Sequence, residues 1–130
     1  MTGRLDSVRI VVVDDDKDLL QFIERLIRRH SGIARTADSY ASALAVLNDF
    51  TPDILLIDIR MPNQDGYALI KTIRLMSRLR HVPAIAVTAY ASEADRDSAL
   101  ESGFQAHLPK PFAPESLIEE IAEMLHQPLK

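Results

Sequence analysis

The chain of 130 residues is 47% hydrophobic, which suits one domain with a single core and leaves no room for a second domain of ordinary size. Its formal net charge of -4 argues against a broad surface for nucleic acid or anionic membrane, and the lack of cysteine excludes disulfides, thiolate metal sites and a cysteine nucleophile. Its strongly apolar runs IVVV and ILLI are far too short to span a membrane, and the start MTGRLDSVRI has no signal-peptide core. We therefore expect one cytoplasmic domain over residues 1–130, with a core from about 8 to 125.

In the first half of the chain, short apolar runs alternate with longer segments of helical periodicity. Residues 8–13 form the first predicted strand, and the periodicity predicts a helix over about 17–30. GIARTA (32–37) is a weaker strand, followed by a helix that Ser39 can cap. DILLID (53–58) is the clearest central strand, and Pro52 precedes it at a position where proline is tolerated.

The second half continues the same alternation. The loop IRMPNQDG leads to a third helix, predicted over about 67–79. PAIAVTA gives a fourth strand that ends at Thr88, and SEAD, from Ser92, resembles a capping box for a helix that ends at Gly103. QAHL is a short fifth strand, and Pro114 opens a last helix with an apolar inner face.

Five strands and five helices thus alternate strictly along the chain. Such alternation predicts βα units around a parallel sheet, joined by right-handed crossovers with helices on both faces. Strands of continuous Val, Ile and Leu suit a sheet that is covered on both sides. The predicted architecture is a doubly wound α/β sandwich.

Polar residues follow the predicted strands at the edge where such sheets hold their sites. Asp14 and Asp15 follow the first strand, Asp58 ends the third, Thr88 ends the fourth and Lys110 follows the fifth. Taken alone, the acid run that begins at Asp14 could be a solvated turn with a helix cap, and Thr88 could be an ordinary strand former. Their expected meeting at one edge favours a functional site.

The residue types at this edge indicate a divalent metal and a phosphoryl group. Clustered carboxylates need compensating charge, and hard oxygen ligands suit Mg²⁺, with Mn²⁺ as a second possibility. A carboxylate can also attack phosphorus to form an acyl phosphate. Lys110, Thr88 and the metal would then supply the charge and the donor that the transferred oxygens need.

The stretches VVVDDDKD, LLIDIRMPNQDGY, AVTAYA and HLPKPF follow one another along the chain. Together, in this order, they resemble the receiver (response-regulator) domain of bacterial phosphorelay signalling. The resemblance extends over about residues 8–125. It implies a flavodoxin-like (βα)5 sandwich with a five-stranded parallel sheet of order 2-1-3-4-5.

The resemblance also implies a role for each matching position. Asp58 would be the phosphoacceptor, Asp15 and Asp14 would bind Mg²⁺ directly or through water, and Asp16 would cap the first helix. The remaining implied roles are a metal ligand from the backbone carbonyl of Arg60, contacts to the phosphoryl group from Thr88 and Lys110, and a cis bond at Pro111.

The sequence departs from the receiver pattern at one position and has large residues at two others. The family's aromatic switch position, three before the lysine, is His107 here. Arg60 and Tyr90 occupy the two positions that tune acyl-phosphate hydrolysis in the family, and we expect their bulk to slow it. AHLPKP in place of DYLPKP is similar to receivers attached to hybrid sensor histidine kinases.

The expected function is phosphoryl acceptance from the phosphohistidine of a sensor histidine kinase or a histidine phosphotransfer protein. We expect a downstream protein target, no direct contact with nucleic acid or membrane, and no enzymatic activity beyond the chain's own phosphorylation and dephosphorylation. The oligomeric state is left open.

Two other classes are alternatives. An aspartyl-nucleophile phosphatase or phosphotransferase commonly has a second Asp two residues after the nucleophile, where this chain has Arg60. A flavodoxin-like FMN-binding module would need Ser, Thr and Gly after the first strand, and DDDKD would repel its phosphate. A receiver that only binds partners is a third alternative, which the complete acceptor, metal and lysine set disfavours.

Overall fold

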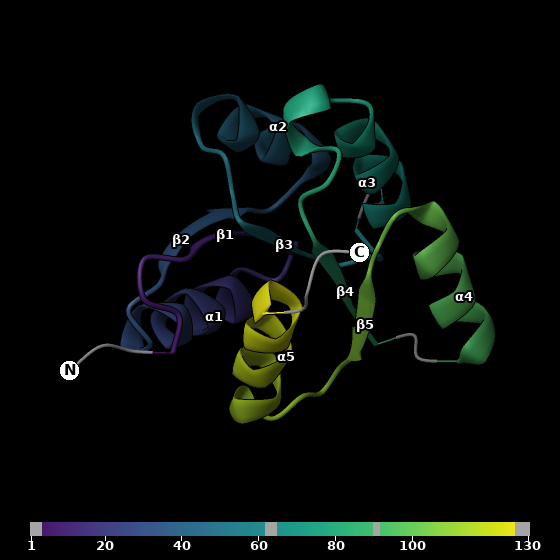
Figure 1. Ribbon diagram of the computed structural model, residues 1–130. Coiled ribbons are helices and arrows are strands. Elements are labelled where there is room, and N and C mark those ends of the chain that lie inside the picture. The colour runs from purple at the N-terminus through teal and green to yellow at the C-terminus, as the bar shows by residue number, and fades with distance from the viewer. Residues whose placement is uncertain (1–3, 62–64, 90–91, 127–130) are drawn as a thin grey trace.

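The computed structural model describes residues 4–61, 65–89 and 92–126, in which strands and helices alternate along the chain (Figure 1). The strands are β1 Arg9–Val13, β2 Ile33–Ala37, β3 Ile54–Ile57, β4 Ala84–Thr88 and β5 Ala106–Pro109. The helices are α1 Lys17–Arg29, α2 Tyr40–Asp49, α3 Gly66–Arg74, α4 Glu93–Ser102 and α5 Pro114–His126, with a 3-10 helix, η1 Ser77–Leu79, after α3. All five predicted strands and all five predicted helices are confirmed.

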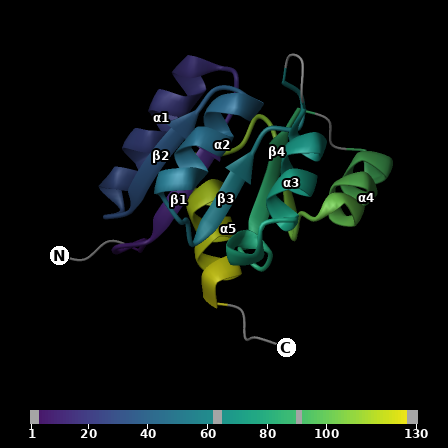
Figure 2. The same cartoon turned by 90° about the horizontal axis from the view of Figure 1, so that it is seen from above.

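The strands form one parallel sheet in the order β2-β1-β3-β4-β5. Helices α1 and α5 cover one face of this sheet, and α2, α3 and α4 cover the other (Figures 1 and 2). The flavodoxin-like doubly wound sandwich is therefore confirmed, with the strand order that the resemblance implied. Its order reverses beside β1, so the carboxyl ends of β1 and β3 flank the switch point of the sheet.

The core consists of two apolar layers, one on each face of the sheet. Neighbouring residues of a strand point to opposite faces, so Val11 and Val13 contact the layer under α2 and α3, and Ile10 and Val12 contact the layer under α1 and α5. Leu5 is fully buried in the second layer, so the packed core begins three residues before the predicted start at residue 8.

The predicted helix ends are confirmed where the sequence carries capping residues. Ser39 accepts a hydrogen bond from the backbone of α2, and Ser92 forms a reciprocal capping box with Asp95. Gly103 ends α4 with a positive φ of 122°, a conformation that favours glycine. Within the described part of the chain, no helix combines the length and the apolar character that crossing a membrane requires.

The third helix is shorter than predicted, because it ends at Arg74 and not near residue 79. Met76 is extended (φ -85°, ψ 119°), which breaks the helix before η1. The Arg74 guanidinium donates hydrogen bonds to backbone carbonyls of the next loop, among them Val82 at 2.7 Å, and to the carbonyl of Gly103 at 2.8 Å. These side-chain bonds stabilise the turn that follows α3, and Leu75, at the C-cap of the helix, is 83% exposed.

Candidate functional site

Backbone hydrogen bonds fix the site residues at the carboxyl edge of the sheet. The N–H of Asp14 donates to the carbonyl of Ala37 (3.0 Å), and that of Asp58 donates to the carbonyl of Val13 (2.8 Å). Each residue thus continues the ladder one step beyond its strand. On the other side of β4, the N–H of Lys110 donates to the carbonyl of Thr88 (2.8 Å). Residues distant in sequence therefore meet on rigid elements, as expected from the strand ends.

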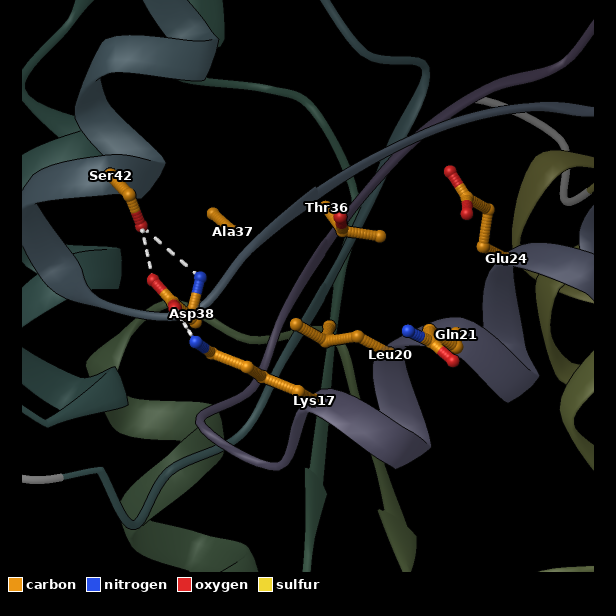
Figure 3. Close-up of a pocket in the computed structure, with 8 residues that line it drawn as sticks. All are labelled: Lys17, Leu20, Gln21, Glu24, Thr36, Ala37, Asp38 and Ser42. Carbon is orange, nitrogen blue, oxygen red and sulfur yellow. Dashed lines mark hydrogen bonds and ion pairs between the residues drawn. The ribbon is translucent and has the colours of Figure 1, made fainter.

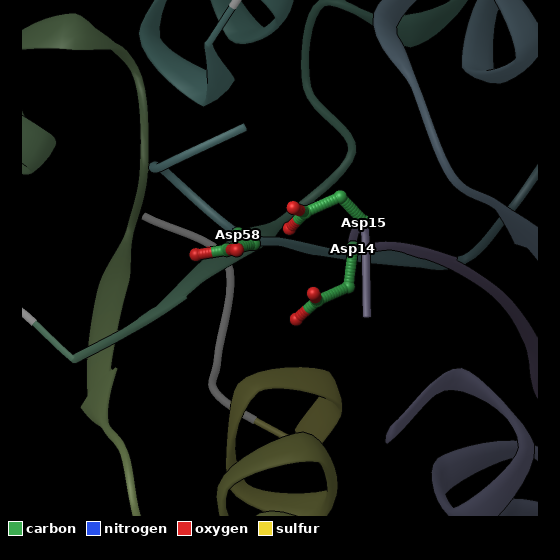
Figure 4. Close-up of side chains that lie close together, drawn as sticks. All are labelled: Asp14, Asp15 and Asp58. Atoms are coloured by element: carbon green, nitrogen blue, oxygen red, sulfur yellow. The ribbon is translucent and has the colours of Figure 1, made fainter. Parts of the chain in front are cut away.

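Asp14, Asp15 and Asp58 form a carboxylate cluster (Figure 4). One oxygen of each lies within 4.8 Å of the others. Asp14 is 3% exposed and Asp58 is 5% exposed, whereas Asp15 faces solvent. The neighbouring Asp16 has a different role, because its carboxylate accepts a hydrogen bond from the N–H of Leu19 (3.2 Å) and caps α1.

Lys110 supplies the positive charge of the cluster. Its ammonium lies 2.7 Å from Asp14 Oδ2 and 3.6 Å from Asp58 Oδ2, so it donates to Asp14 and shares its charge with Asp58. Burial works against the charged lysine, but the hydrogen bond and charge of Asp14, with those of Asp58, leave the pKa of Lys110 above its usual value. Lys110 is therefore a permanent cation in the site.

Asp58 is the most perturbed carboxyl group of the site. Burial, and then the negative charge of Asp14, raise its pKa from 3.8 to about 6, against the opposing effects of Lys110 and of a hydrogen bond from the Arg60 N–H. That N–H lies 3.3 Å from Asp58 Oδ1. A pKa of about 6 keeps Asp58 mainly ionised at neutral pH, at the cost of repulsion from Asp14.

The other predicted site residues lie on β4, on β5 and on the loops that follow the strands. Thr88 is fully buried at the end of β4, the Arg60 side chain is exposed, and His107 is half-buried in β5. The Lys110–Pro111 peptide bond is cis, as the resemblance implied. Tyr90 lies outside the described residues.

The donor set of the cluster fits a hard divalent cation. Three carboxylates carry more negative charge than the ammonium of Lys110 offsets, and their oxygens are close enough to share one ion. The resemblance to receiver domains implies a further oxygen ligand, the backbone carbonyl of Arg60, two residues after Asp58.

The sequence showed only part of the role of Gly66. Gly66, the last residue of the predicted loop IRMPNQDG, begins α3 and packs against the peptide of Asp58. A Cβ at position 66 would lie 2.4 Å from the Asp58 carbonyl oxygen and 2.8 Å from the Ile59 Cα. The Gly66 N–H also donates to the carbonyl of Ile59 (2.8 Å). The glycine was visible in the sequence, but its close packing against the Asp58 peptide could be found only from the structure.

A separate hollow of about 330 Å³ lies between α1 and α2 beside the edge strand β2 (Figure 3). Its charged groups are all paired. Lys17 Nζ lies 3.8 Å from Asp38 Oδ2, and the Ser42 hydroxyl donates to Asp38 Oδ1 at 3.2 Å. Glu24 pairs with Arg28 of the same helix. We assign this hollow no ligand, because local contacts account for its charged groups.

Known proteins share both the sequence pattern and the fold. The model of the response regulator receiver domain family matches residues 10–122. An uncharacterised 14.6 kDa protein of Leptolyngbya boryana is 38% identical over 92% of this chain and 91% of its own length. The transcriptional regulatory protein PrrA of Mycobacterium tuberculosis is 35% identical over 98% of this chain and 54% of its own length. The chain thus spans about half the length of this regulator and of several other curated transcriptional regulators that it matches.

A solved receiver domain shares the fold of this chain. The receiver domain of the sensor histidine kinase PA1611 of Pseudomonas aeruginosa, solved with a magnesium ion in its active-site cleft, is 29% identical to this chain. It superposes with a TM-score of 0.81 over 92% of this chain and 97% of that one. With the family model matching most of the sequence, and with the family's strand order and acidic pocket in place, the chain belongs to the response regulator receiver domain family, the phosphoryl-accepting module of two-component signalling.

Proposed function

We propose that Asp58 is the phosphoacceptor and that it takes its phosphoryl group from a phosphohistidine on a partner protein. The observation that carries this proposal is the placement of Asp58. Its buried carboxylate belongs to the acidic cluster and lies 3.6 Å from the ammonium of Lys110. An ionised nucleophile, a fixed cation and a metal-binding donor set are the parts that phosphoryl transfer to a carboxylate needs.

In the proposed reaction, an Asp58 carboxylate oxygen bonds to phosphorus while the phosphorus–nitrogen bond to the histidine breaks. The electron pair of that bond leaves with the imidazole nitrogen, so the products are an aspartyl phosphate and a free histidine. Lys110 pairs with a phosphoryl oxygen, and the hydroxyl of Thr88 donates a hydrogen bond to another. The protein's contribution is positioning and charge stabilisation.

A bound Mg²⁺, or Mn²⁺ in its place, would be held by the carboxylates of Asp14, Asp15 and Asp58 and the backbone carbonyl of Arg60. When bound, the ion supplies positive charge that offsets the carboxylates and the phosphoryl oxygens. Asp14 would then contact both the ion and Lys110, because the Lys110 ammonium already donates a hydrogen bond to Asp14 Oδ2. The other oxygen of Asp14 accepts the N–H of Asp16 (2.9 Å), which holds the carboxylate in one orientation.

The donor would be a histidine kinase or a histidine phosphotransfer protein, docked beside Lys110. An apolar hollow of about 380 Å³ opens there between α1 and the β5–α5 loop, lined by Leu19, Phe22, Ala89, Lys110, Pro111 and Phe112. Phe22 is 44% exposed at its rim. An apolar partner surface seated in this hollow would bring its phosphohistidine next to the cluster.

The output would be a changed binding surface for a downstream protein. Phosphorylation adds about -1.5 to -2 charges at one end of β3, and Thr88 and His107 would shift in response. Residues 1–130 would act as one receiver domain in the cytoplasm, with no enzymatic activity beyond its own phosphorylation and dephosphorylation. Any contact with DNA would belong to another polypeptide or another domain.

The test is incubation with acetyl phosphate and Mg²⁺, followed by intact mass spectrometry. We expect one phosphoryl adduct on the native chain, none with EDTA, and none on Asp58→Asn. Asp38→Asn is the matched control, because Asp38 is an acidic residue outside the cluster that pairs with Lys17, and it should leave the adduct unchanged. No adduct on the native chain would contradict the proposal. Turnover of small phosphate esters would indicate an aspartyl phosphatase instead, and a flavin absorbance band would indicate an FMN-binding module.

A further inference from the structure

Helix α4 is held less firmly than the other helices that cover the sheet. Of its ten residues only Ala99 is buried, whereas α1 buries four residues. The helix is polar along most of its length, and Leu100 is exposed. Little apolar burial fixes the N-terminal half of α4, so contacts there have a large influence on where the helix lies.

Tyr67 of α3 makes such a contact. Its hydroxyl donates a hydrogen bond of 3.5 Å to the backbone carbonyl of Asp95, in the first turn of α4. Asp95 precedes Ala99 by four residues, so both lie on the face of α4 that turns toward α3. Figures 1 and 2 both show α4 beside α3. Burial and the charge of Asp95 raise the pKa of Tyr67, whose side chain is half-buried beside α4.

The position of Tyr67 is tied to the phosphoacceptor through its neighbour Gly66. The first turn of α3 packs on the Asp58 peptide so closely that no Cβ fits at position 66. The hydrogen bond from the Gly66 N–H to the Ile59 carbonyl fastens the same turn to the loop after Asp58. A shift of the Asp58–Arg60 backbone must therefore displace Tyr67 as well.

We propose that Tyr67 is a positioning residue that transmits the state of the Asp58 loop to α4. This inference rests on the proposed phosphorylation of Asp58. The path runs from the Asp58 peptide through Gly66 to the Tyr67 hydroxyl and the first turn of α4. It is separate from any path through Thr88 and His107, which starts on β4 and β5.

The experiment compares amide hydrogen exchange of the native chain with that of Tyr67→Phe, each before and after phosphorylation with acetyl phosphate and Mg²⁺. Tyr67→Phe removes one hydroxyl and keeps the ring. We expect amides of residues 95–98 to exchange about 2- to 10-fold faster in the resting variant, as for the loss of one hydrogen bond. We also expect the change that phosphorylation causes in α4 to fall to less than half of its native size.

Tyr40→Phe is the matched control, since the Tyr40 hydroxyl bonds to the Thr72 hydroxyl (2.6 Å) and joins α2 to α3. It should alter exchange in those helices and leave α4 as in the native chain. The inference would be overturned if amides of α4 in unphosphorylated Tyr67→Phe exchanged at the native rate. It would also be overturned if phosphorylation changed exchange in α4 of that variant as much as in the native chain, or if it changed nothing in α4 of the native chain.

Failure of the inference is distinguishable from failure of the proposed function. A native chain that acquires no phosphoryl adduct contradicts the proposed function, while the comparison of the resting proteins still tests the Tyr67 contact. A normal adduct on Tyr67→Phe with unchanged exchange in α4 rejects the inference alone.

Discussion

Asp58 combines burial with a negative charge that the proposed phosphoryl transfer requires. Its pKa of about 6 results first from burial and then from the negative charge of Asp14. Because the unfolded chain ionises Asp58 near 3.8, the unfolded state loses its proton first as the pH rises. The folded state without metal therefore loses stability between pH 3.8 and about 6, and this loss is complete above that window.

Asp58→Asn should accordingly stabilise the metal-free protein. We expect the gain at pH 7.5 to reach up to about 3 kcal/mol, since one pKa unit corresponds to roughly 1.4 kcal/mol. The gain should become small near pH 4, where Asp58 is protonated in the native fold and about half protonated in the unfolded chain. Urea denaturation in EDTA at the two pH values measures the difference. An Asn variant less stable than the native protein at pH 7.5 would show that the charges of Asp14 and Asp58 do not oppose folding.

Arg60 and Tyr90 are expected to set the lifetime of the aspartyl phosphate. The Arg60 side chain is exposed beside the acceptor, while Tyr90 enters this prediction from the sequence alone. Replacing both with alanine should speed hydrolysis about 3- to 10-fold, which corresponds to a barrier lower by about 0.7 to 1.4 kcal/mol. Decay of the phosphorylated form, followed by intact mass, gives the rate. Arg80→Ala, at an exposed arginine after η1, is the control, and an unchanged half-life in the double variant would reject the idea.

At the scale of elements, the contact between α3 and the acceptor loop depends on Gly66. Alanine normally favours a helix, but at this position its Cβ would meet the Asp58 carbonyl oxygen at 2.4 Å. We expect Gly66→Ala to lose about 1–3 kcal/mol of stability, as in other overpacked sites. We also expect a smaller rise in melting temperature on addition of Mg²⁺, since the Asp58 and Arg60 backbone must move.

Gly32→Ala separates these two effects. Its Cβ would meet the Ile27 Cγ2 at 2.6 Å in the turn before β2, away from the carboxylate cluster. It should therefore lower stability in EDTA and keep the native response to Mg²⁺. Equal responses to Mg²⁺ in the two variants would show that Gly66 affects only folding.

The sequence predicted those elements whose signals are local. The run ILLI predicted β3 because a strand buried on both faces needs continuous apolar residues. Ser39, Ser92 and Gly103 predicted helix ends through short-range capping. The end of α3 was missed because Arg74 bonds to carbonyls as far away as Gly103, and such contacts leave no periodic pattern.

For the site, the sequence predicted which residues lie at the same edge of the sheet, but not how their side chains contact one another. Parallel strands bring their carboxyl ends together, so Asp14, Asp58 and Lys110 could be placed at one edge from the sequence. That Lys110 lies closer to Asp14 than to Asp58 could not be predicted, because it depends on the side-chain conformation. The contact of Tyr67 with α4 required the packing angle between two helices, which no sequence signal specifies.

At the scale of the whole molecule, the proposed function requires one edge of the sheet to admit both a metal and a partner protein. The apolar hollow beside Lys110 lies between α1 and the β5–α5 loop, next to the buried carboxylates. A small donor such as acetyl phosphate needs only the cluster, whereas a protein donor must also dock. Phosphorylation rates with acetyl phosphate therefore report on the carboxylate cluster alone, whereas rates with a protein donor also depend on docking.

Phe22→Ala should slow phosphorylation by a histidine kinase active on the native chain, and leave the rate with acetyl phosphate unchanged. We expect a loss of about tenfold, as for a contact worth roughly 1.4 kcal/mol in the docked complex. Leu75→Ala is the control, because Leu75 is also an exposed large apolar residue but lies at the end of α3 on the opposite face. Equal rates for native and Phe22→Ala chains with the kinase would place the docking surface elsewhere.

The identity of the phosphorylated residue tests the central claim most directly. After phosphorylation with acetyl phosphate and Mg²⁺, reduction with borohydride converts an aspartyl phosphate to homoserine, which marks its position for peptide mass spectrometry. The carboxylate cluster predicts a single marked residue, Asp58. A mark on Asp14 or Asp15, or none on any residue of a chain that carries the adduct, would contradict Asp58 as the phosphoacceptor.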